Sequence, residues 1–167
     1  MIELKTPISD EEIKKLKVGD RVTISGRIYT GRDAVLPQLV KLAKSGKLIE
    51  RGIQLQGSVI FHTAVSPAGV GPTSSNKYEI ESCFEILSRE GVRLHLGKGA
   101  IGSEAVKILD DYQSVFAVIA PVTALLTSRT LEKKVIAFPE LGMEALHELV
   151  IEGYPAIIAA AHNQTIY

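Results

Sequence analysis

The sequence contains a single cysteine, Cys83, and no tryptophan. One thiol forms no internal disulfide, and it builds neither a four-cysteine zinc site nor an iron–sulfur cluster held by several thiolates of the same chain. An excess of charge of one sign is also missing, because 19 Lys and Arg side chains balance 19 Asp and Glu side chains. Nucleic-acid-binding proteins usually carry a broad basic surface, so this balance argues against that class.

Long hydrophobic runs are absent too. The longest, residues 115–126, is too short to span a bilayer and contains Pro121 and Thr123. Residues 1–15 mix charged with apolar side chains and therefore lack the apolar segment of a signal peptide. We expect a cytoplasmic protein that binds neither nucleic acid nor a membrane.

The composition that remains is that of a globular domain. The chain has 167 residues, of which 46% are hydrophobic, and this is enough for a self-sufficient core. No internal repeat or linker-like tract divides the sequence, so we expect a single domain over residues 1–167.

Hydrophobic spacing predicts alternating strands and helices through most of the chain. The expected strands are residues 21–29, 58–63, 92–96, 115–120, 135–138 and 156–160, of which 115–120 and 135–138 should be buried. The expected helices are residues 10–16, 34–45, 78–90, 103–112 and 140–146, with Ser9 and Asp33 capping the first two. Residues 66–75, rich in Gly, Pro and Ser, should form a loop. This alternation predicts an α/β layered domain with a mixed, largely parallel sheet.

Three glycine-containing loops carry polar side chains directly after a predicted strand, where open α/β sheets usually bind ligands. In the first, Thr30-Gly31-Arg32-Asp33, the guanidinium of Arg32 has the geometry to grip a carboxylate or a phosphate. The ordinary alternative is that Gly31 makes the turn, Asp33 caps a helix and Arg32 is solvated.

The second loop, residues 69–77, combines several hydroxyls with backbone N–H groups and the cation of Lys77. These are the parts of an anion site or of an oxyanion-stabilising site. The alternative is an ordinary loop in which Ser74 or Ser75 caps the next helix.

The third loop, residues 97–102, contains the spacing G-x-G-x-x-G of a dinucleotide fingerprint. It lies in the middle of the chain, however, and lacks the acidic residue that follows in that fingerprint. Either it binds an anion through Lys98, or it is a flexible turn with a solvated lysine.

The four histidines, His62, His95, His147 and His162, have no spacing typical of a metal site. His62 ends a predicted strand beside the second loop, which leaves open a site residue, a proton carrier or a structural histidine. Cys83 falls on the apolar face of a predicted helix, so we expect it in the core.

Four segments carry a family resemblance: GDRVTISGRIYTGRDA at 19–34, GPTSS at 71–75, GKG at 97–99 and FPELGMEA at 138–145. Together they resemble the β subunit, or C-terminal domain, of the class I fumarate hydratase and tartrate dehydratase iron–sulfur hydro-lyases. They occur in the family's order and span most of the chain.

The resemblance implies a swivelling β/β/α domain that closes over a catalytic partner. This partner would be a cysteine-bearing α subunit, in an α2β2 heterotetramer, that holds a 4Fe–4S cluster through three cysteines. The open iron of the cluster would act as a Lewis acid on a 2-hydroxy acid. With one cysteine in this chain, the cluster must belong to the other subunit.

The resemblance also implies roles for four residues of this chain. Arg32 of the GRD motif would grip a substrate carboxylate, and Lys98 of GKG would be a further substrate contact. Thr73 of GPT would be the base that takes a proton from the neighbouring carbon, with Lys77 and Lys98 stabilising its alkoxide. Arg32, Lys77 and Lys98 should then form a cationic pocket for a four-carbon dicarboxylate.

Two departures from the family pattern concern the substrate. The family often has arginine four residues after the GPT threonine, where this chain has Lys77, which keeps the charge but lacks bidentate geometry. After GRD the family often continues Ala-Ala-His, whereas here Val35 and Leu36 follow Ala34. The leading prediction is reversible hydration of fumarate to malate, in complex with an α subunit. The alternatives are a tartrate or other hydroxy-acid dehydratase subunit, and a non-catalytic anion-binding domain or phosphohistidine carrier using His62.

Overall fold

The computed structural model describes residues 1–74, 76–120 and 122–167. Its strands are β1 (Ile2–Lys5), β2 (Arg21–Thr30), β3 (Val59–Phe61), β4 (Thr63–Ser66), β5 (Gly69–Thr73), β6 (Leu94–Gly97), β7 (Val115–Val118), β8 (Thr130–Ala137), β9 (Leu146–Ala161) and β10 (Gln164–Thr165). Its helices are α1 (Asp10–Lys15), α2 (Leu36–Lys44), α3 (Lys77–Ser82), α4 (Phe84–Arg89), α5 (Ser103–Asp111) and α6 (Thr123–Ser128), with the 3-10 helices η1 (Ile49–Arg51) and η2 (Pro139–Glu144). Within the described ranges, no helix is long and apolar enough to cross a membrane.

The main sheet closes on itself. Strands β2, β3, β6 and β7 pair in parallel in that order, and β9 runs antiparallel to both β7 and β2. Strand β1 adds to β2 in parallel, while β8 and β10 add to β9 in antiparallel fashion. Strands β4 and β5 form a separate hairpin. The predicted α/β fold with a mixed sheet is confirmed, and β9 is the antiparallel strand that joins its two ends.

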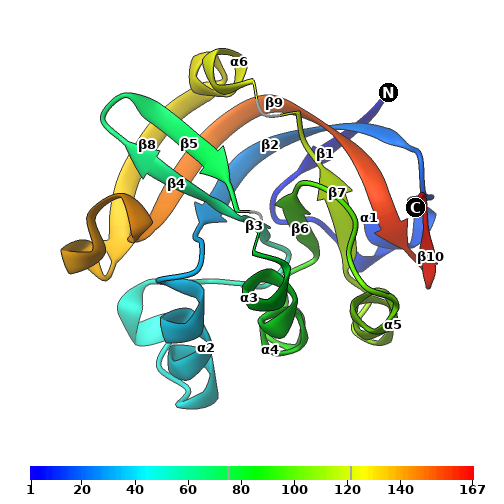
Figure 1. The fold of residues 1–167 in the computed structure, drawn as a ribbon, viewed down its shortest axis with the longest axis horizontal. Helices are drawn as coiled ribbons and strands as arrows, with labels where there is room; N and C mark the ends of the chain where they lie inside the picture. The colour runs from blue at the N-terminus through cyan, green and yellow to red at the C-terminus, as the bar shows by residue number, and fades with distance from the viewer. Residues whose placement is uncertain (75, 121) are drawn as a thin grey trace.

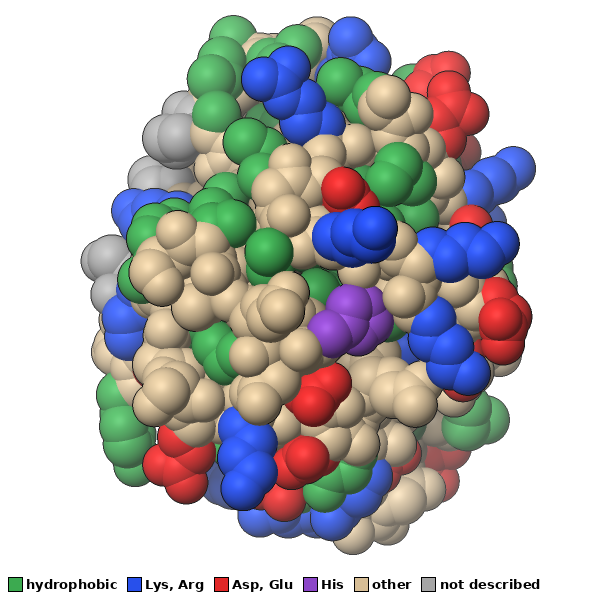
Figure 2. All heavy atoms as spheres, turned by 90° about the vertical axis from the view of Figure 1, so that its right-hand side faces the viewer, with side chains coloured by type: hydrophobic (Ala, Val, Ile, Leu, Met, Phe, Trp, Pro, Cys, Tyr) green, Lys and Arg blue, Asp and Glu red, His purple; other side chains and the backbone are tan. Residues whose placement is uncertain are grey.

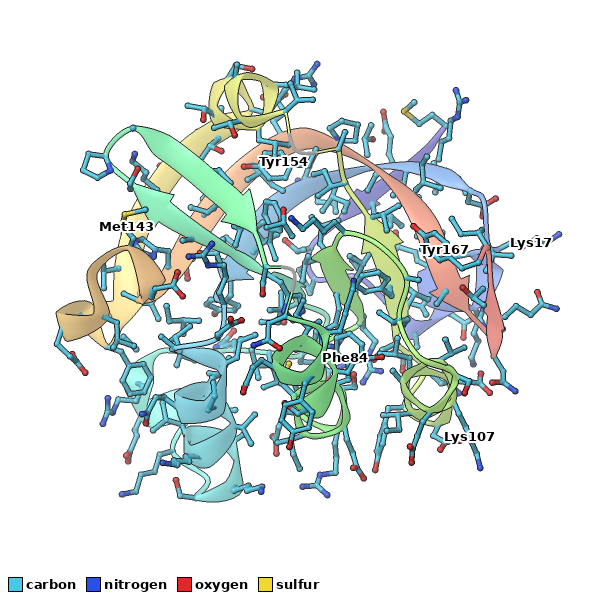
Figure 3. All side chains as sticks on the ribbon, in the orientation of Figure 1. Lys17, Phe84, Lys107, Met143, Tyr154 and Tyr167 are labelled. Atoms are coloured by element: carbon cyan, nitrogen blue, oxygen red, sulfur yellow. The ribbon has the colours of Figure 1, made fainter. Side chains whose placement is uncertain are left out.

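Three layers follow from this closure. Figure 1 shows β2 and β9 arching over β3, β6 and β7, while α2, α4 and α5 lie on the other side of those strands. Side chains of β3 alternate between two cores: Val59 and Phe61 pack between the strand layers, and Ile60 packs toward the helices. Tyr154 and Phe84, labelled in Figure 3, belong to the first and the second core respectively. This is the β/β/α layering that the resemblance implies.

The carboxyl ends of the parallel strands lie at a common edge of the sheet. In their register, Tyr29 lies beside Ile60, Ile60 beside His95, and His95 beside Phe116. The segments that follow the carboxyl ends of β2, β3 and β6 therefore emerge close together. Side chains from these separate segments can therefore meet at one place.

Local sequence signals near the N-terminus are confirmed. The Ser9 hydroxyl accepts a hydrogen bond from the Glu12 backbone N–H at 3.2 Å, and the Glu12 carboxylate accepts one from the Ser9 backbone N–H at 2.9 Å. Strand β2 buries Val22, Ile24 and Ile28 on one face, as their period-two spacing predicts.

The last long strand extends far beyond its prediction. Strand β9 has 16 residues, whereas the sequence predicted only residues 156–160. Glycine usually weakens a strand, but here a bulge accommodates Gly153, whose N–H donates to the Ser25 hydroxyl at 2.9 Å. The predicted helix over 140–146 is the shorter 3-10 helix η2, because β9 already begins at Leu146.

Three predictions in the remaining chain are wrong in detail. Residues 69–73, expected in a loop, form β5 opposite β4. The helix predicted over 78–90 is two helices separated at Cys83, whose N–H bonds to the Ile80 carbonyl only three residues back. Strand β8 is an exposed edge strand rather than a buried one, because its residues 131–135 face solvent.

Gly26 lies where the register between β2 and β9 shifts, and its φ is +106°. A Cβ at this position would lie 2.3 Å from Thr6 Oγ1. We expect Gly26→Ala to lower the free energy of unfolding by about 3 kcal/mol, measured by urea denaturation. Gly19 is the matched control, because its φ is also positive (+89°) but nothing lies within 4 Å of an added Cβ. Gly19→Ala should cost about 1 kcal/mol, and equal losses in the two variants would contradict the steric explanation.

Candidate active site

A hollow of about 360 Å³ lies at the carboxyl edge of the sheet. The described residues that line it are Arg32, Asp33, Thr73, Ser74, Asn76, Lys98 and Glu144. They come from the segments that end or follow β2, β5 and β6, and from the end of η2. The structure therefore brings together three of the four residues singled out in the sequence, namely Arg32, Thr73 and Lys98.

The turn after β2 positions Arg32. The Gly31 N–H donates to the Phe61 carbonyl at 3.0 Å, which ties this turn to β3. A Cβ on Gly31 would lie 2.6 Å from Val35 Cγ1, so the close approach requires glycine. The Arg32 Nε donates to Glu144 Oε2 at 2.7 Å, and the Arg32 Nη2 donates to the same oxygen. This ion pair fixes the guanidinium at the wall of the hollow.

Asp33 does not cap the following helix, contrary to the prediction. Helix α2 begins at Leu36 with Val35 at its N-cap and without a side-chain cap. The Asp33 carboxylate instead accepts a hydrogen bond from the Ser74 hydroxyl at 2.9 Å. This bond joins the loop after β2 to the end of β5.

Thr73 and Ser74 enter the hollow from the β4–β5 hairpin. Thr73 pairs with Thr63 across the hairpin, and the Ser74 N–H donates to the His62 carbonyl at 2.8 Å. Thr73 is only 5% exposed. A hydroxyl held by a strand pairing and largely removed from water is well placed for chemistry, because its position costs little further ordering.

The start of α3 supports the turn after β6. Asn76 caps this helix, and not Ser74 as in the alternative interpretation of this loop. Ser75, the other candidate cap, lies outside the described residues. Lys77 is not among the described residues that line the hollow, and its ammonium donates to the Lys98 carbonyl. Burial, and in smaller part the charge of Lys98, lowers the pKa of Lys77. Lys77 therefore braces the turn that carries Lys98.

The turn with the G-x-G-x-x-G spacing is held by side chains of α3. The Gly102 N–H, at the N-cap of α5, donates to the Glu81 carboxylate at 2.5 Å. A helix start already occupied by a carboxylate of its own chain is not arranged to receive a dinucleotide phosphate. Lys98, which precedes this helix start in the chain, lines the hollow.

The lining of the hollow is less cationic than the sequence predicted. The positive charges of Arg32 and Lys98 are matched by the negative charges of Asp33 and Glu144. Basic and acidic side chains are also interspersed on the face drawn in Figure 2, in keeping with the zero net charge. A dianion in the hollow would need positive charge beyond that of these four side chains.

The sequence matches a known family over nearly its whole length. The sequence model of the family described as Fumarase C-terminus matches residues 1–165. The chain belongs to this family.

Relatives of this chain are named for hydro-lyase reactions. "Putative L(+)-tartrate dehydratase subunit beta" of Methanocaldococcus jannaschii is 29% identical over 96% of this chain and 88% of its own length. "L(+)-tartrate dehydratase subunit beta" of Escherichia coli is 27% identical over 84% of this chain and 72% of its own length. "Fumarate hydratase class I, anaerobic" of E. coli is 25% identical over 94% of this chain, but this chain spans only 30% of that protein.

Glu144 lines the hollow and was not singled out from the sequence. It lies in FPELGMEA at 138–145, a segment that carried the family resemblance but received no role. Its ion pair with Arg32 spans 112 residues of sequence. The motif was a usable signal for a functional residue, whereas the pairing depends on how η2 and the β2 turn meet in the fold.

His62 is buried between the end of β3 and the start of β4. It is 0% exposed, its ring centroid is 5.7 Å from that of His95, and neither of its ring nitrogens has a hydrogen-bond partner among the described residues. Burial, followed by the charge of Lys77, lowers the pKa of His62 to about 3. A phosphohistidine must meet its phosphoryl donor at the surface, so this burial argues against the carrier alternative.

The buried histidines should make the free energy of unfolding fall in acid. The unfolded chain binds protons at His62 and His95 below pH 6.5, whereas burial keeps both neutral in the folded chain, so stability falls as pH falls from 6.5 toward 3. We expect each histidine to remove about 2 kcal/mol from the free energy of unfolding between pH 7 and pH 5. Urea denaturation at both pH values should show a smaller loss in His62→Leu. An unchanged loss in His62→Leu would contradict the assignment.

Cys83 lies in the core, as predicted. It is 2% exposed, its thiol donates to the Ile80 carbonyl at 2.9 Å, and burial raises the pKa of the thiol to about 12. A thiolate ligand must be deprotonated and within reach of the metal. Among the described residues, no three His, Cys, Asp or Glu side chains are grouped to hold a metal ion. The residues that the structure describes therefore do not fit a 4Fe–4S cluster.

Proposed function

We propose that this chain is the β subunit of a two-subunit hydro-lyase that acts on a four-carbon dicarboxylate. The observation that carries the proposal is the convergence of Arg32, Thr73 and Lys98, from three separate segments, on one hollow. The reaction removes a proton from one carbon and hydroxide from its neighbour, which leaves a double bond and water. The first assignment is the interconversion of malate with fumarate and water.

In this proposal the two cations bind carboxylate and the threonine moves a proton. Arg32 presents a planar fork that matches a carboxylate, and Lys98 adds a point charge at the same hollow. Thr73, as its alkoxide, accepts the proton from the substrate carbon and becomes a neutral hydroxyl, which gives that proton to water before the next cycle. A threonine hydroxyl is a weak base, so this step requires stabilisation of the alkoxide by Lys98 and, through the turn it braces, by Lys77.

The charge balance of the hollow supports a site completed by a partner. Arg32 and Lys98 are offset by Asp33 and Glu144, so a dianion gains from cations that another subunit would bring. The proposed partner is a cysteine-bearing α subunit, which would hold the 4Fe–4S cluster in an α2β2 heterotetramer. The words "subunit beta" in the names of two relatives support this division of labour.

Tartrate dehydration is the second candidate, and the lengths of the relatives favour it. The two relatives named as tartrate dehydratase subunits are covered by this chain over 88% and 72% of their lengths, whereas the fumarate hydratase is covered over 30%. Steady-state assays of the assembled complex against fumarate, malate and tartrate separate the two. A larger kcat/KM for malate and fumarate supports the first assignment, a larger value for tartrate supports the second, and no turnover of any of the three contradicts both.

A further inference from the structure

The segment between β8 and β9 has an unusual backbone that returns Glu144 to the sheet edge. Phe138 has a φ of +56°, and Gly142 combines a φ of 59° with a ψ of −121°, a region that side chains with a Cβ rarely adopt. Met143, labelled in Figure 3, lies on this segment and is 49% exposed. Directly after Glu144 the chain is buried again, with Ala145 only 1% exposed. Glu144 is therefore anchored on its C-terminal side by the core.

The contact between Glu144 and Arg32 uses one edge of the guanidinium. Nε and Nη2 of Arg32 both donate to Oε2 of Glu144, with the Nε–Oε2 distance at 2.7 Å. The exposed fractions are 27% for the Arg32 side chain and 25% for that of Glu144. Water screens such a pair less than it screens a pair on the open surface, so the contact restrains the arginine.

This restraint matters because an arginine binds carboxylate through a flat fork. Two N–H donors that converge on one oxygen hold this edge of the guanidinium in place and keep that oxygen in the plane of the group. Without this contact the Nε and Nη2 edge of Arg32 would be less restrained, and a substrate would have to complete its ordering on binding. Glu144 also lines the hollow itself, so its charge lies next to the ligand that Arg32 would hold.

We propose that Glu144 is a positioning residue that holds the Arg32 guanidinium ready for a substrate carboxylate. The inference rests on the proposed function in one respect, namely that Arg32 binds substrate. It also assigns a role to the FPELGMEA segment, whose Gly142 turn and buried Ala145 deliver one carboxylate to one arginine.

The test compares Glu144→Gln, Glu144→Asp and Glu140→Gln in the complex with the α subunit. Glutamine keeps the size of the side chain but loses the charge, so Glu144→Gln should raise KM about tenfold with a kcat change of less than about threefold. Glu144→Asp keeps the charge and should recover part of the loss. Glu140→Gln makes the same chemical change at an exposed position of η2 and should leave both constants unchanged.

A second readout does not depend on turnover. In the full chain, proton exchange at Arg32 Nε, followed by nitrogen-15 NMR, should be at least about tenfold faster in Glu144→Gln than in the unaltered chain and in Glu140→Gln. Unchanged exchange overturns the inference, and so does a KM in Glu144→Gln that is unchanged or lower, since a lower KM means that Glu144 competes with substrate. If the unaltered complex turns over no hydroxy acid while Nε exchange still responds to Glu144→Gln, the proposed function fails and the positioning contact stands.

Discussion

Arg32→Ala in the assembled complex is expected to lower kcat/KM for the dicarboxylate substrate about 100-fold, which corresponds to about 3 kcal/mol. The reason is that truncation removes a partly buried cation from the hollow and leaves the Glu144 carboxylate there without its partner. Most of the loss should fall on KM, because the arginine binds a carboxylate that does not react. Steady-state kinetics with the preferred substrate measure the effect.

Two further variants separate charge from geometry and from general damage. Arg32→Lys keeps a positive charge but not the fork, so it should recover only part of the lost kcat/KM. Arg51→Ala removes an arginine from an exposed position at the end of η1 and should behave like the unaltered complex. An Arg32→Ala complex that retains full turnover would remove Arg32 from the site.

Thr73→Val is expected to lower kcat about 1000-fold while KM changes less than about threefold, because general-base catalysis typically contributes about 10²- to 10⁴-fold. Valine has nearly the shape of threonine and is favoured in strands, so β5 and its pairing with Thr63 should persist. The variant thus removes a hydroxyl from the hollow with little change in packing. Steady-state kinetics, with the melting temperature as a folding check, measure the outcome.

The controls for Thr73 address the hydroxyl itself. Thr73→Ser retains an oxygen at the same place and should keep kcat within about tenfold of the unaltered value. Thr123→Val makes the same replacement at the exposed start of α6 and should have no effect. If Thr73→Val turns over at the normal rate, the proton must go to another group.

Short-range sequence signals predicted much of the fold, because their causes are local. The Ser9–Glu12 capping box and the buried face of β2 depend only on residues within a few positions of one another. The full length of β9 was not predictable in this way. Its first half is held by pairing with β8 and β2, and its Gly153 bulge is satisfied by Ser25, which lies far away in sequence.

The site residues likewise fall into two groups: those that local sequence signals predicted and those whose contacts depend on the fold. Arg32, Thr73 and Lys98 stood out because each belongs to a polar, glycine-containing loop at the end of a predicted strand, and the structure brings them to one hollow. Asp33 was assigned to a helix cap because a single sequence cannot reveal its bond to Ser74. Lys77 is not among the described residues that line the hollow, because the position of α3 directs its ammonium to the Lys98 carbonyl.

One measurement tests most directly whether this chain is the β subunit of a two-subunit hydro-lyase. The chain is purified alone and together with a cysteine-bearing iron–sulfur partner subunit, and both preparations are assayed for hydration of fumarate and dehydration of malate and tartrate. We predict that the chain alone is inactive and that the complex turns over at least one of these acids. Turnover by the chain alone, or an assembled iron–sulfur complex that turns over none of them, would contradict the account.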